Sequence, residues 1–280
     1  MNISRNVGKS NVNRKIQRIE LQLMRAKKWR YLRYIHLYEY IKDIAGELTS
    51  ACICGAGHGL AEIALALQFP HIRFTITDII SSSYPNYHGA MQLSWNWDIE
   101  NVEFSIWNVL QPTSKKFDIV CSTEMLEHIS NPIKAVENMR KSSSKYNYCL
   151  VPFSDWKTNM DVNARQSAFR RHEHQFYGFD RQILEGLFGS ATRISGTYWS
   201  NAGLLLRNEL NKLSPDEIAE HFNELKDLAC TDIRDEVPQS LNEASGIKIL
   251  SRADASSSIP ICMPPYLSEI SKSPTEDNSG

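Results

Sequence analysis

The chain has no long hydrophobic run and few cysteines. No uninterrupted apolar stretch among its 280 residues approaches the ~18 that a membrane-spanning helix needs, so we expect no transmembrane span and no membrane partner. The first ten residues, MNISRNVGKS, contain no apolar core, so we expect no secretory signal. The six cysteines include one close pair, Cys52 and Cys54, whose one-residue gap is shorter than that of a zinc or redox pair. These absences predict a cytoplasmic protein with buried thiols.

Two nucleotide-binding signatures are also absent from the glycine-rich segment 51–62, ACICGAGHGLAE. A dinucleotide fingerprint, G-x-G-x-x-G/A counted from Gly55, would place its last glycine or alanine at Leu60. A P-loop would continue into Gly-Lys-Ser/Thr, which does not follow here. The segment therefore fits neither a dinucleotide site nor a P-loop.

The composition is that of an ordinary globular protein, but its charge is unevenly distributed. Hydrophobic residues make up 42% and charged residues 22%, and the length suffices for one large domain with appendages. Within the net charge of −1, residues 1–35 carry ten Lys and Arg and one acid, Glu20. Apolar and aromatic residues recur at helical spacing there, which predicts a helix over 12–43. Its basic face can be solvated, pair with the acidic remainder of the chain, or contact an anionic substrate.

The glycine-rich segment predicts a strand, a turn and a helix over 60–67. Gly55, Gly57 and Gly59 alternate directly after a short apolar run. Glycine lets the main chain approach a ligand where a Cβ would clash, and the helix start presents unpaired N–H groups. The next apolar run ends at Asp78, where a carboxylate can accept hydrogen bonds from two ribose hydroxyls. The pattern indicates a nucleoside-cofactor site, and its plain alternative is close strand–helix packing.

Because its third glycine stands at position 59, the glycine-rich segment resembles the first motif of class I S-adenosylmethionine (SAM)-dependent methyltransferases. Residues 117–132, FDIVCSTEMLEHISNP, resemble the FDxV…LEHxxxP segment of small-molecule members of that family. The resemblance covers roughly residues 50–200. It implies an α/β fold with a Rossmann-like, doubly wound, seven-stranded and mostly parallel sheet whose last strand is antiparallel, and SAM as the cofactor. Ile53 is a departure, because the family has there an Asp that helps to hold the methionine end of the cofactor.

The resemblance also implies which residues bind the cofactor. The glycines would cradle it, Asp78 would hold its ribose, and Asn108, at the end of a predicted strand over 102–107, would meet its adenine through the amide oxygen. Glu124 is either a hydrogen-bonding residue on the cofactor side or a helix-start residue. The predicted set is Gly55, Ala56, Gly57, Gly59, Asp78, Ile79, Asn108, Val109 and Glu124.

Two histidines are the predicted catalytic residues. His128 follows the apolar run 117–121, a predicted buried strand, and it either acts as a general base or braces the loop or contacts the cofactor. His174 ends the triplet 172–174, His-Glu-His, whose alternation suits a metal or a substrate clamp. The same stretch resembles the family's HxHxxxF/Y segment, where no metal is needed. We therefore predict His128 and His174 as catalytic residues and no metal site.

The remaining segments predict additions to the methyltransferase domain of residues 46–253. The basic helical segment is assigned to residues 1–45. The resemblance implies that strands over 191–199 and 246–251 form an antiparallel pair at one sheet edge, with a helical insertion over 201–245 between them. Residues 254–280, rich in Ser and Pro, are expected to be a disordered tail.

The predicted function is methyl transfer from SAM to a small or medium-sized metabolite, most readily at an oxygen. Two alternatives stay open. One is an RNA or other nucleic-acid methyltransferase whose basic N-terminal helix follows phosphates. The other is a non-catalytic scaffold protein that kept the fold, which the departure at Ile53 motivates.

Overall fold

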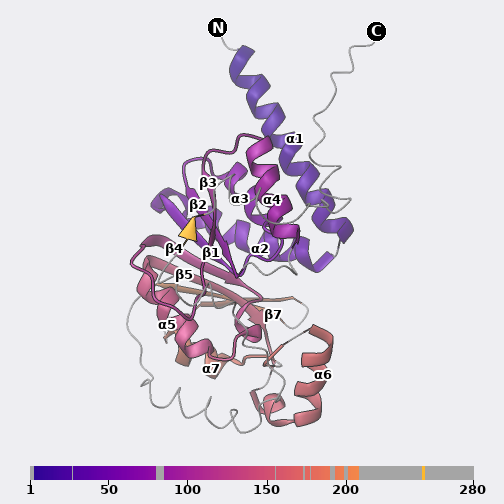
Figure 1. Ribbon diagram of the computed structural model, residues 1–280, viewed down its shortest axis with the longest axis vertical. Helices are drawn as coiled ribbons and strands as arrows, with labels where there is room; N and C mark the ends of the chain where they lie inside the picture. The colour runs from indigo at the N-terminus through magenta and orange to yellow at the C-terminus, as the bar shows by residue number, and fades with distance from the viewer. Residues whose placement is uncertain are drawn as a thin grey trace.

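An eight-stranded sheet lies at the centre of the protein, as the computed structural model shows (Figure 1). The structure describes residues 3–26, 28–79, 85–154, 156–172, 174–176, 178–189, 193–198, 201–207 and 248–249. The strands are β1 (Ser50–Cys54), β2 (Arg73–Asp78), β3 (Val102–Ile106), β4 (Phe117–Thr123), β5 (Ser143–Pro152), β6 (Arg193–Tyr198), β7 (Asn201–Arg207) and β8 (Lys248–Ile249). Their order across the sheet is β6-β7-β5-β4-β1-β2-β3-β8.

The five strands β1 to β5 are parallel, which confirms the predicted α/β class. Their order, 3-2-1-4-5, is the one that characterises doubly wound Rossmann-like sheets. The chain leaves β1 toward β2 on one side and later returns to add β4 on the other side. The order therefore reverses between β1 and β4, and the carboxyl ends of these two strands border a crevice.

Both edges of the sheet differ from the prediction. β6 and β7 form an antiparallel hairpin, and β7 pairs antiparallel with β5. The strand β7 occupies residues predicted to begin a helical insertion, whereas β8, within the predicted strand 246–251, pairs with β3 at the opposite edge. Within the described residues the sheet has eight strands and not the predicted seven, and β6 and β8 lie at opposite edges and not side by side. The pattern of leucines over 204–206 is compatible with either a helix or a strand. They form a strand because they pair with β5. Most of the predicted insertion and the whole tail lie outside the described residues.

Helices cover the two faces of the sheet, with α1 to α4 on one face and α5 and α7 on the other (Figure 1). Residues 12–26 and 28–43 of the predicted helix are helical, and position 27 lies outside the described residues. The helices are α1 (Ile3–Ala26), α2 (Lys28–Ile44), α3 (Leu60–Gln68), α4 (Pro85–Asn96), α5 (Pro132–Ser142), α6 (Val162–His172) and α7 (Arg181–Phe188), with short 3-10 turns η1 (Ala45–Glu47), η2 (Leu126–His128) and η3 (Trp156–Met160). No helix in this part of the chain has the length and apolarity to cross a bilayer.

Side-chain alternation along β1 divides the core into two clusters. Ala51 and Ile53 belong to the cluster under α1 to α4, whereas Cys52 and Cys54 belong to the cluster under α5 and α7. Ile53 is completely buried, so the position where the family has an Asp is a core position here. The four cysteines in the described residues are buried thiols, as predicted: Cys52, Cys54, Cys121 and Cys149.

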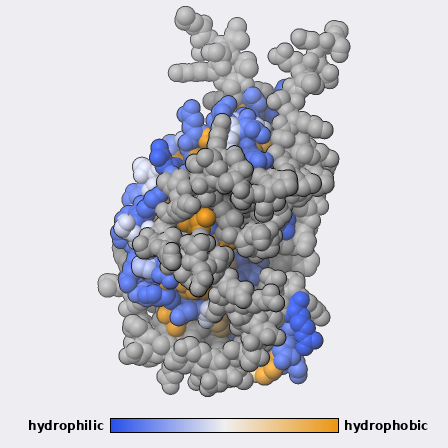
Figure 2. Space-filling model, in the orientation of Figure 1, coloured by the Kyte–Doolittle hydropathy of each residue, from blue (hydrophilic) through white to orange (hydrophobic). Residues whose placement is uncertain are grey.

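Two helix starts follow from local side-chain chemistry. Asn131 Oδ1 accepts a hydrogen bond of 3.0 Å from the Lys134 N–H, and Pro132 begins α5. Asp180 Oδ1 accepts a bond of 2.9 Å from the Ile183 N–H and caps α7. The face shown in Figure 2 is mostly hydrophilic where residues are described. The large apolar side chains exposed within those residues are Leu21, Met160 and Val162.

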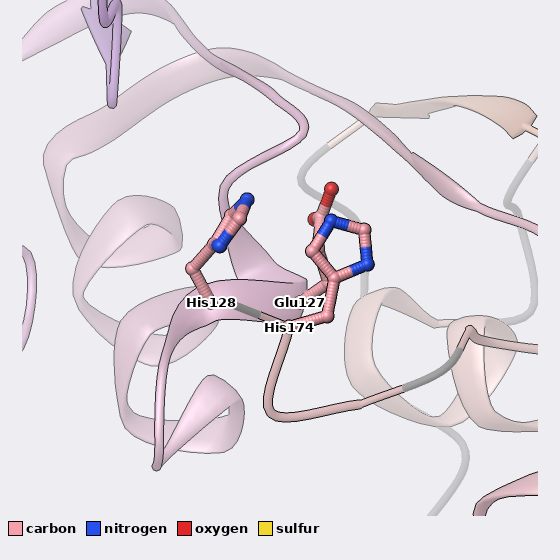
Figure 3. Close-up of side chains that lie close together, drawn as sticks. All are labelled: Glu127, His128 and His174. Carbon is pink, nitrogen blue, oxygen red and sulfur yellow. The ribbon is translucent and has the colours of Figure 1, made fainter. Parts of the chain in front are cut away.

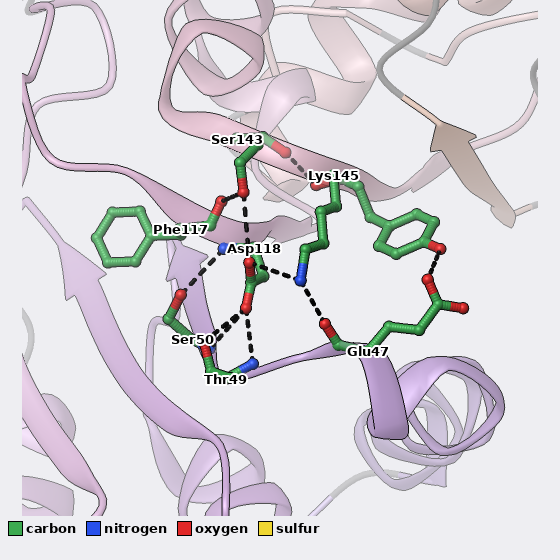
Figure 4. A network of polar contacts seen from close by, with 9 residues as sticks. Glu47, Thr49, Ser50, Phe117, Asp118, Ser143 and Lys145 are labelled. Carbon is green, nitrogen blue, oxygen red and sulfur yellow. Dashed lines mark hydrogen bonds and ion pairs between the residues drawn. The ribbon is translucent and has the colours of Figure 1, made fainter.

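A polar network ties together the amino ends of β1, β4 and β5 (Figure 4). Asp118 Oδ2 accepts hydrogen bonds from the Thr49 N–H at 2.7 Å and from its hydroxyl at 2.8 Å. Asp118 Oδ1 forms an ion pair of 3.0 Å with Lys145 Nζ, which also donates to the Glu47 carbonyl. Burial would raise the pKa of Asp118, but the Thr49 donors and Lys145 outweigh it and lower the pKa to about 2.

Replacing Asp118 tests whether this network stabilises the sheet. Asp118→Ala should lower the free energy of unfolding at pH 7 by about 1–3 kcal/mol, because a charged acceptor of several bonds is lost. The folded pKa lies below the ordinary value of 3.8, so the contribution is present above pH 4 and disappears as the pH falls toward 2. Urea unfolding between pH 3 and 7 measures both effects. The control is Glu137→Ala, which removes exposed pairs with Lys134 and Lys141 worth about 1 kcal/mol or less. Equal losses would contradict the assignment.

Candidate functional site

The candidate site lies where the loops after β1 and β4 meet, at the reversal point of the sheet. The glycine turn follows β1, and residues 124–128 follow β4. The two loops are in contact, because a Cβ added to Gly55 would come within 2.6 Å of Met125 Cγ. Glycine at position 55 thus allows the loop after β4 to pack against the turn.

All three glycines of the turn have left-handed backbone conformations, with φ of +66° at Gly55, +59° at Gly57 and +69° at Gly59. The turn is held by hydrogen bonds of 3.1 Å from the Ala56 N–H to the Thr77 carbonyl and from the Gly59 N–H to the Ala56 carbonyl. A Cβ on Gly57 would meet no atom within 4 Å, so the turn has an open side at this residue. A left-handed turn with one open glycine is a main-chain cradle that a ligand can approach closely.

Asp78 faces this turn from the end of β2. Its Oδ2 accepts a hydrogen bond of 2.5 Å from the Gly57 N–H. Burial raises the pKa of Asp78 to about 6, although the N–H groups of Gly57 and Ile79 oppose the shift. The carboxylate therefore sits in a poorly solvated place beside the cradle, with lone pairs that a donor can still engage.

Asn108 and Val109 follow β3 and join the same edge of the sheet. The Asn108 side chain is buried, and its Oδ1 accepts a hydrogen bond of 3.0 Å from the Leu110 N–H. That bond uses one of the two lone pairs of the oxygen and leaves the other and the amide NH₂ for a ligand. Val109 is buried, and its carbonyl accepts a bond of 2.8 Å from Asn138 Nδ2.

Glu124 has a left-handed backbone, with φ of +52°, which a non-glycine residue seldom adopts. Its N–H donates to the Leu150 carbonyl at 2.7 Å, and its Oε2 accepts a 2.6 Å bond from Arg33 Nη2. Because η2 begins at Leu126, Glu124 is not a helix-start residue. Burial lowers the pKa of Arg33 to about 10, so its guanidinium is still charged at neutral pH.

Arg33 lies on α2, and no local sequence pattern predicts that it contacts the loop after β4. Arg33 therefore pairs with an acid of the remaining chain, which is one of the three roles predicted for the basic segment. Two further buried acids near it were not predicted. Burial raises the pKa of Glu62, on α3, to about 7. Glu127 is fully buried, and burial likewise raises its pKa.

The two predicted histidines lie together, although 46 positions separate them in the sequence. Their ring centroids are 4.6 Å apart and the rings are nearly perpendicular. Figure 3 shows both rings beside the Glu127 carboxylate, and the potential ligand atoms of the three residues all lie within 4.8 Å of one another. The Glu127 carbonyl accepts bonds from the N–H groups of Gln175 and Phe176, at 2.6 and 3.2 Å, and so joins the two segments.

Comparisons with known proteins give structural likenesses only. No protein-family model and no curated protein matches the chain. An O-methyltransferase family protein from Burkholderia thailandensis is 12% identical, with a TM-score of 0.48, over 67% of this chain and 62% of its own. Human N-acetylserotonin methyltransferase in complex with SAM is 12% identical, with a TM-score of 0.46, over 69% and 56%. Magnesium protoporphyrin IX methyltransferase from Synechocystis, with bound SAH, is 13% identical, with a TM-score of 0.43, over 62% and 84%. The chain thus spans less than two thirds of the first two proteins.

Replacing Gly55 and Gly57 by alanine in separate variants distinguishes the cost of backbone strain from the cost of a steric clash. Gly57→Ala should destabilise the protein by about 1–2 kcal/mol, the cost of a left-handed backbone for an L-residue. Gly55→Ala should be worse by about 1–3 kcal/mol, because its Cβ also overlaps Met125. Thermal or urea unfolding measures both. Adding Met125→Ala to each variant should reduce the difference in unfolding free energy between Gly55→Ala and Gly57→Ala. If that difference is unchanged, the contact with Met125 is not its cause.

Proposed function

We propose that this protein is a SAM-dependent methyltransferase that methylates a small or medium-sized metabolite at an oxygen. The observation that supports it most is the Asp78 carboxylate hydrogen-bonded to Gly57 in an open, left-handed glycine turn. This arrangement lies at the crevice of a Rossmann-like sheet, where such folds bind nucleoside ligands. A half-buried carboxylate and a main chain that can be approached closely both suit an adenosyl group.

The residues at this edge fit the parts of the cofactor. Asp78 would accept from the ribose hydroxyls, and the N–H groups of the glycine turn and of the start of α3 would face polar groups of the ligand. Asn108 would hold the adenine through its amide and its remaining lone pair. When bound, SAM supplies a methyl group on a positively charged sulfonium.

Charge supports a cationic ligand at this site. Glu62, Asp78, Glu124 and Glu127 are the acids around it, and Arg33 is the cation that pairs with one of them. Because Ile53 is a core residue, the methionine end of the cofactor cannot use that position. The acids of α3 and of the loop after β4 can balance the sulfonium instead.

We assign the two histidines to the acceptor. Residues 124–128 contact the glycine turn through Met125, so His128 and His174 lie on the β4 side of the proposed cofactor site. Orienting an acceptor there can supply ~7–11 kcal/mol of the barrier, and a proton-accepting group adds typically ~10²–10⁴-fold. His128 is exposed and therefore accessible to an acceptor from solvent.

The decisive test of this function is calorimetry with SAM and with its demethylated product. Binding of both is expected, and no heat with either would favour a scaffold. Incubation with methyl-labelled SAM and separate small-molecule and RNA fractions then identifies the acceptor class. If only the RNA fraction is labelled, the acceptor is a nucleic acid and not a metabolite.

Asp78 makes the cofactor affinity dependent on pH. Asp78→Ala should weaken SAM binding by about 1–3 kcal/mol, the scale of lost charge-assisted bonds. Because the pKa of Asp78 is about 6, the wild-type affinity should fall as the pH is lowered from 7 to 5, when the carboxylate becomes protonated. Asp78→Asn retains an acceptor for Gly57 and should show little of this pH dependence.

The same variant controls for folding. The pKa of Asp78 is raised above its ordinary 3.8, so the charged form disfavours the folded state and stability falls as the pH rises through 4 to 6. Asp78→Asn should therefore unfold at a higher temperature than the wild type at pH 7. Unchanged SAM affinity in a folded Asp78→Ala variant would remove the ribose assignment.

His128 should matter to turnover and not to cofactor binding. His128→Ala is expected to leave SAM affinity within about twofold, because the contact with the glycine turn is made by Met125, and to slow methyl transfer by ~10²-fold or more. His71→Ala is the matched control, since His71 contacts the Ala45 carbonyl at 3.0 Å near the other end of the strands. Equal rates for the two variants would end the catalytic assignment of His128.

A further inference from the structure

We propose that Glu127, His128 and His174 bind a divalent transition-metal ion through one carboxylate and two imidazoles. The sequence predicts no metal site, because the stretch that contains His174 resembles a family segment in which no metal is needed. The structure instead joins His174 to two residues that follow β4. The binding itself does not depend on the proposed function.

The positions of the three groups suit a common ion. Their potential ligand atoms lie within 4.8 Å of one another. Two ligands at ~2.1 Å from one ion are ~3–4 Å apart, so small side-chain rotations suffice to close the site. Figure 3 shows the two rings and the carboxylate extending on the same side of the chain segments that carry them.

Glu127 supplies a second, independent observation. Its side chain is completely buried, and both carboxylate oxygens have no hydrogen-bond partner within the described residues. Burying such a carboxylate without a partner is unfavourable. Arg33 is the nearby cation, but its guanidinium bonds to Glu124, whose own charge repels Glu127. A cation between Glu127 and the two imidazoles would balance the buried charge.

The backbone holds these ligands in place. The carbonyl of Glu127 accepts bonds from Gln175 and Phe176, directly after His174. The His128 N–H donates to the Met125 carbonyl at 3.0 Å, which fixes η2. Both segments that carry ligands are therefore attached to each other before any ion binds, so little ordering is needed on binding.

The ligand types select the class of ion. Imidazole nitrogens favour Fe²⁺, Co²⁺ or Zn²⁺ over the oxygen-seeking Mg²⁺ and Ca²⁺, and two histidines with one carboxylate leave coordination positions open. An acceptor hydroxyl that coordinates there has a lowered pKa and releases its proton to water. Its oxygen then forms the bond to the methyl carbon while the sulfur–carbon bond breaks and sulfur keeps the electron pair. This role, unlike the binding, rests on the proposed function.

Titration of the full-length, chelator-treated protein with Co²⁺ tests the site. We expect one Co²⁺ per chain, followed by its visible absorption, and displacement by Zn²⁺ but not by Mg²⁺ or Ca²⁺ at equal concentration. Glu127→Gln keeps the shape of the side chain, and with His174→Ala it should weaken Co²⁺ binding by about 100-fold or more, as expected for the loss of a ligand. His71→Ala should bind like the wild type.

The outcomes separate this proposal from the methyltransferase assignment. No Co²⁺ binding by the wild type, or equal binding by Glu127→Gln, His174→Ala and His71→Ala, would overturn the metal site. SAM calorimetry on the same variants measures the other assignment. Loss of Co²⁺ with SAM binding retained supports the metal site, whereas a wild type that binds Co²⁺ but not SAM would overturn only the methyltransferase.

Discussion

Buried negative charge at the carboxyl edge of the sheet is the constraint on which the site depends. Glu62, Asp78 and Glu127 are poorly solvated there, and burial raises the pKa of each. Arg33 is directly bonded to a fourth acid, Glu124. Such an arrangement is unfavourable in the protein alone, because each charge is taken out of water without a full partner. A sulfonium and a metal ion both bring positive charge to this place.

The topology of the sheet explains why the charges meet. Parallel strands end at one edge, so the segments after β1, β2, β3 and β4 converge although they are far apart in the sequence. Between β1 and β4 the order reverses, which is the place where open sheets of this kind bind ligands. The missing side chain at Gly55 then allows Met125, and the acids that flank it, to lie against the glycine turn.

The N-terminal helices are part of this site as well as a cover for the sheet. Ile19, Tyr34 and Ile41 are buried in the core cluster under α1 to α4, which fixes α2 on the domain. That packing sets the position of Arg33, which reaches the strained residue Glu124. A backbone conformation that is unfavourable for Glu is thus accompanied by a short ion pair, an arrangement typical of functional sites.

The sequence by itself determined the parallel strands of the sheet and several of the helices that cover it. Apolar runs and capping residues such as Asn131 and Asp180 specified β1 to β5, α3, α5 and α7, because strand alternation and helix starts depend on neighbours a few residues away. The glycine turn was recognisable for the same reason, since a left-handed backbone restricts residue type locally.

Only the tertiary structure decided the sheet edges and the clusters of charge. The leucines after position 203 became a strand because β5 offered open hydrogen-bonding groups, and β8 joined the far edge beside β3. The Arg33–Glu124 pair and the meeting of Glu127 with His174 join segments 91 and 47 residues apart. No local pattern encodes such contacts, because they arise only when packing of the whole core places the segments side by side.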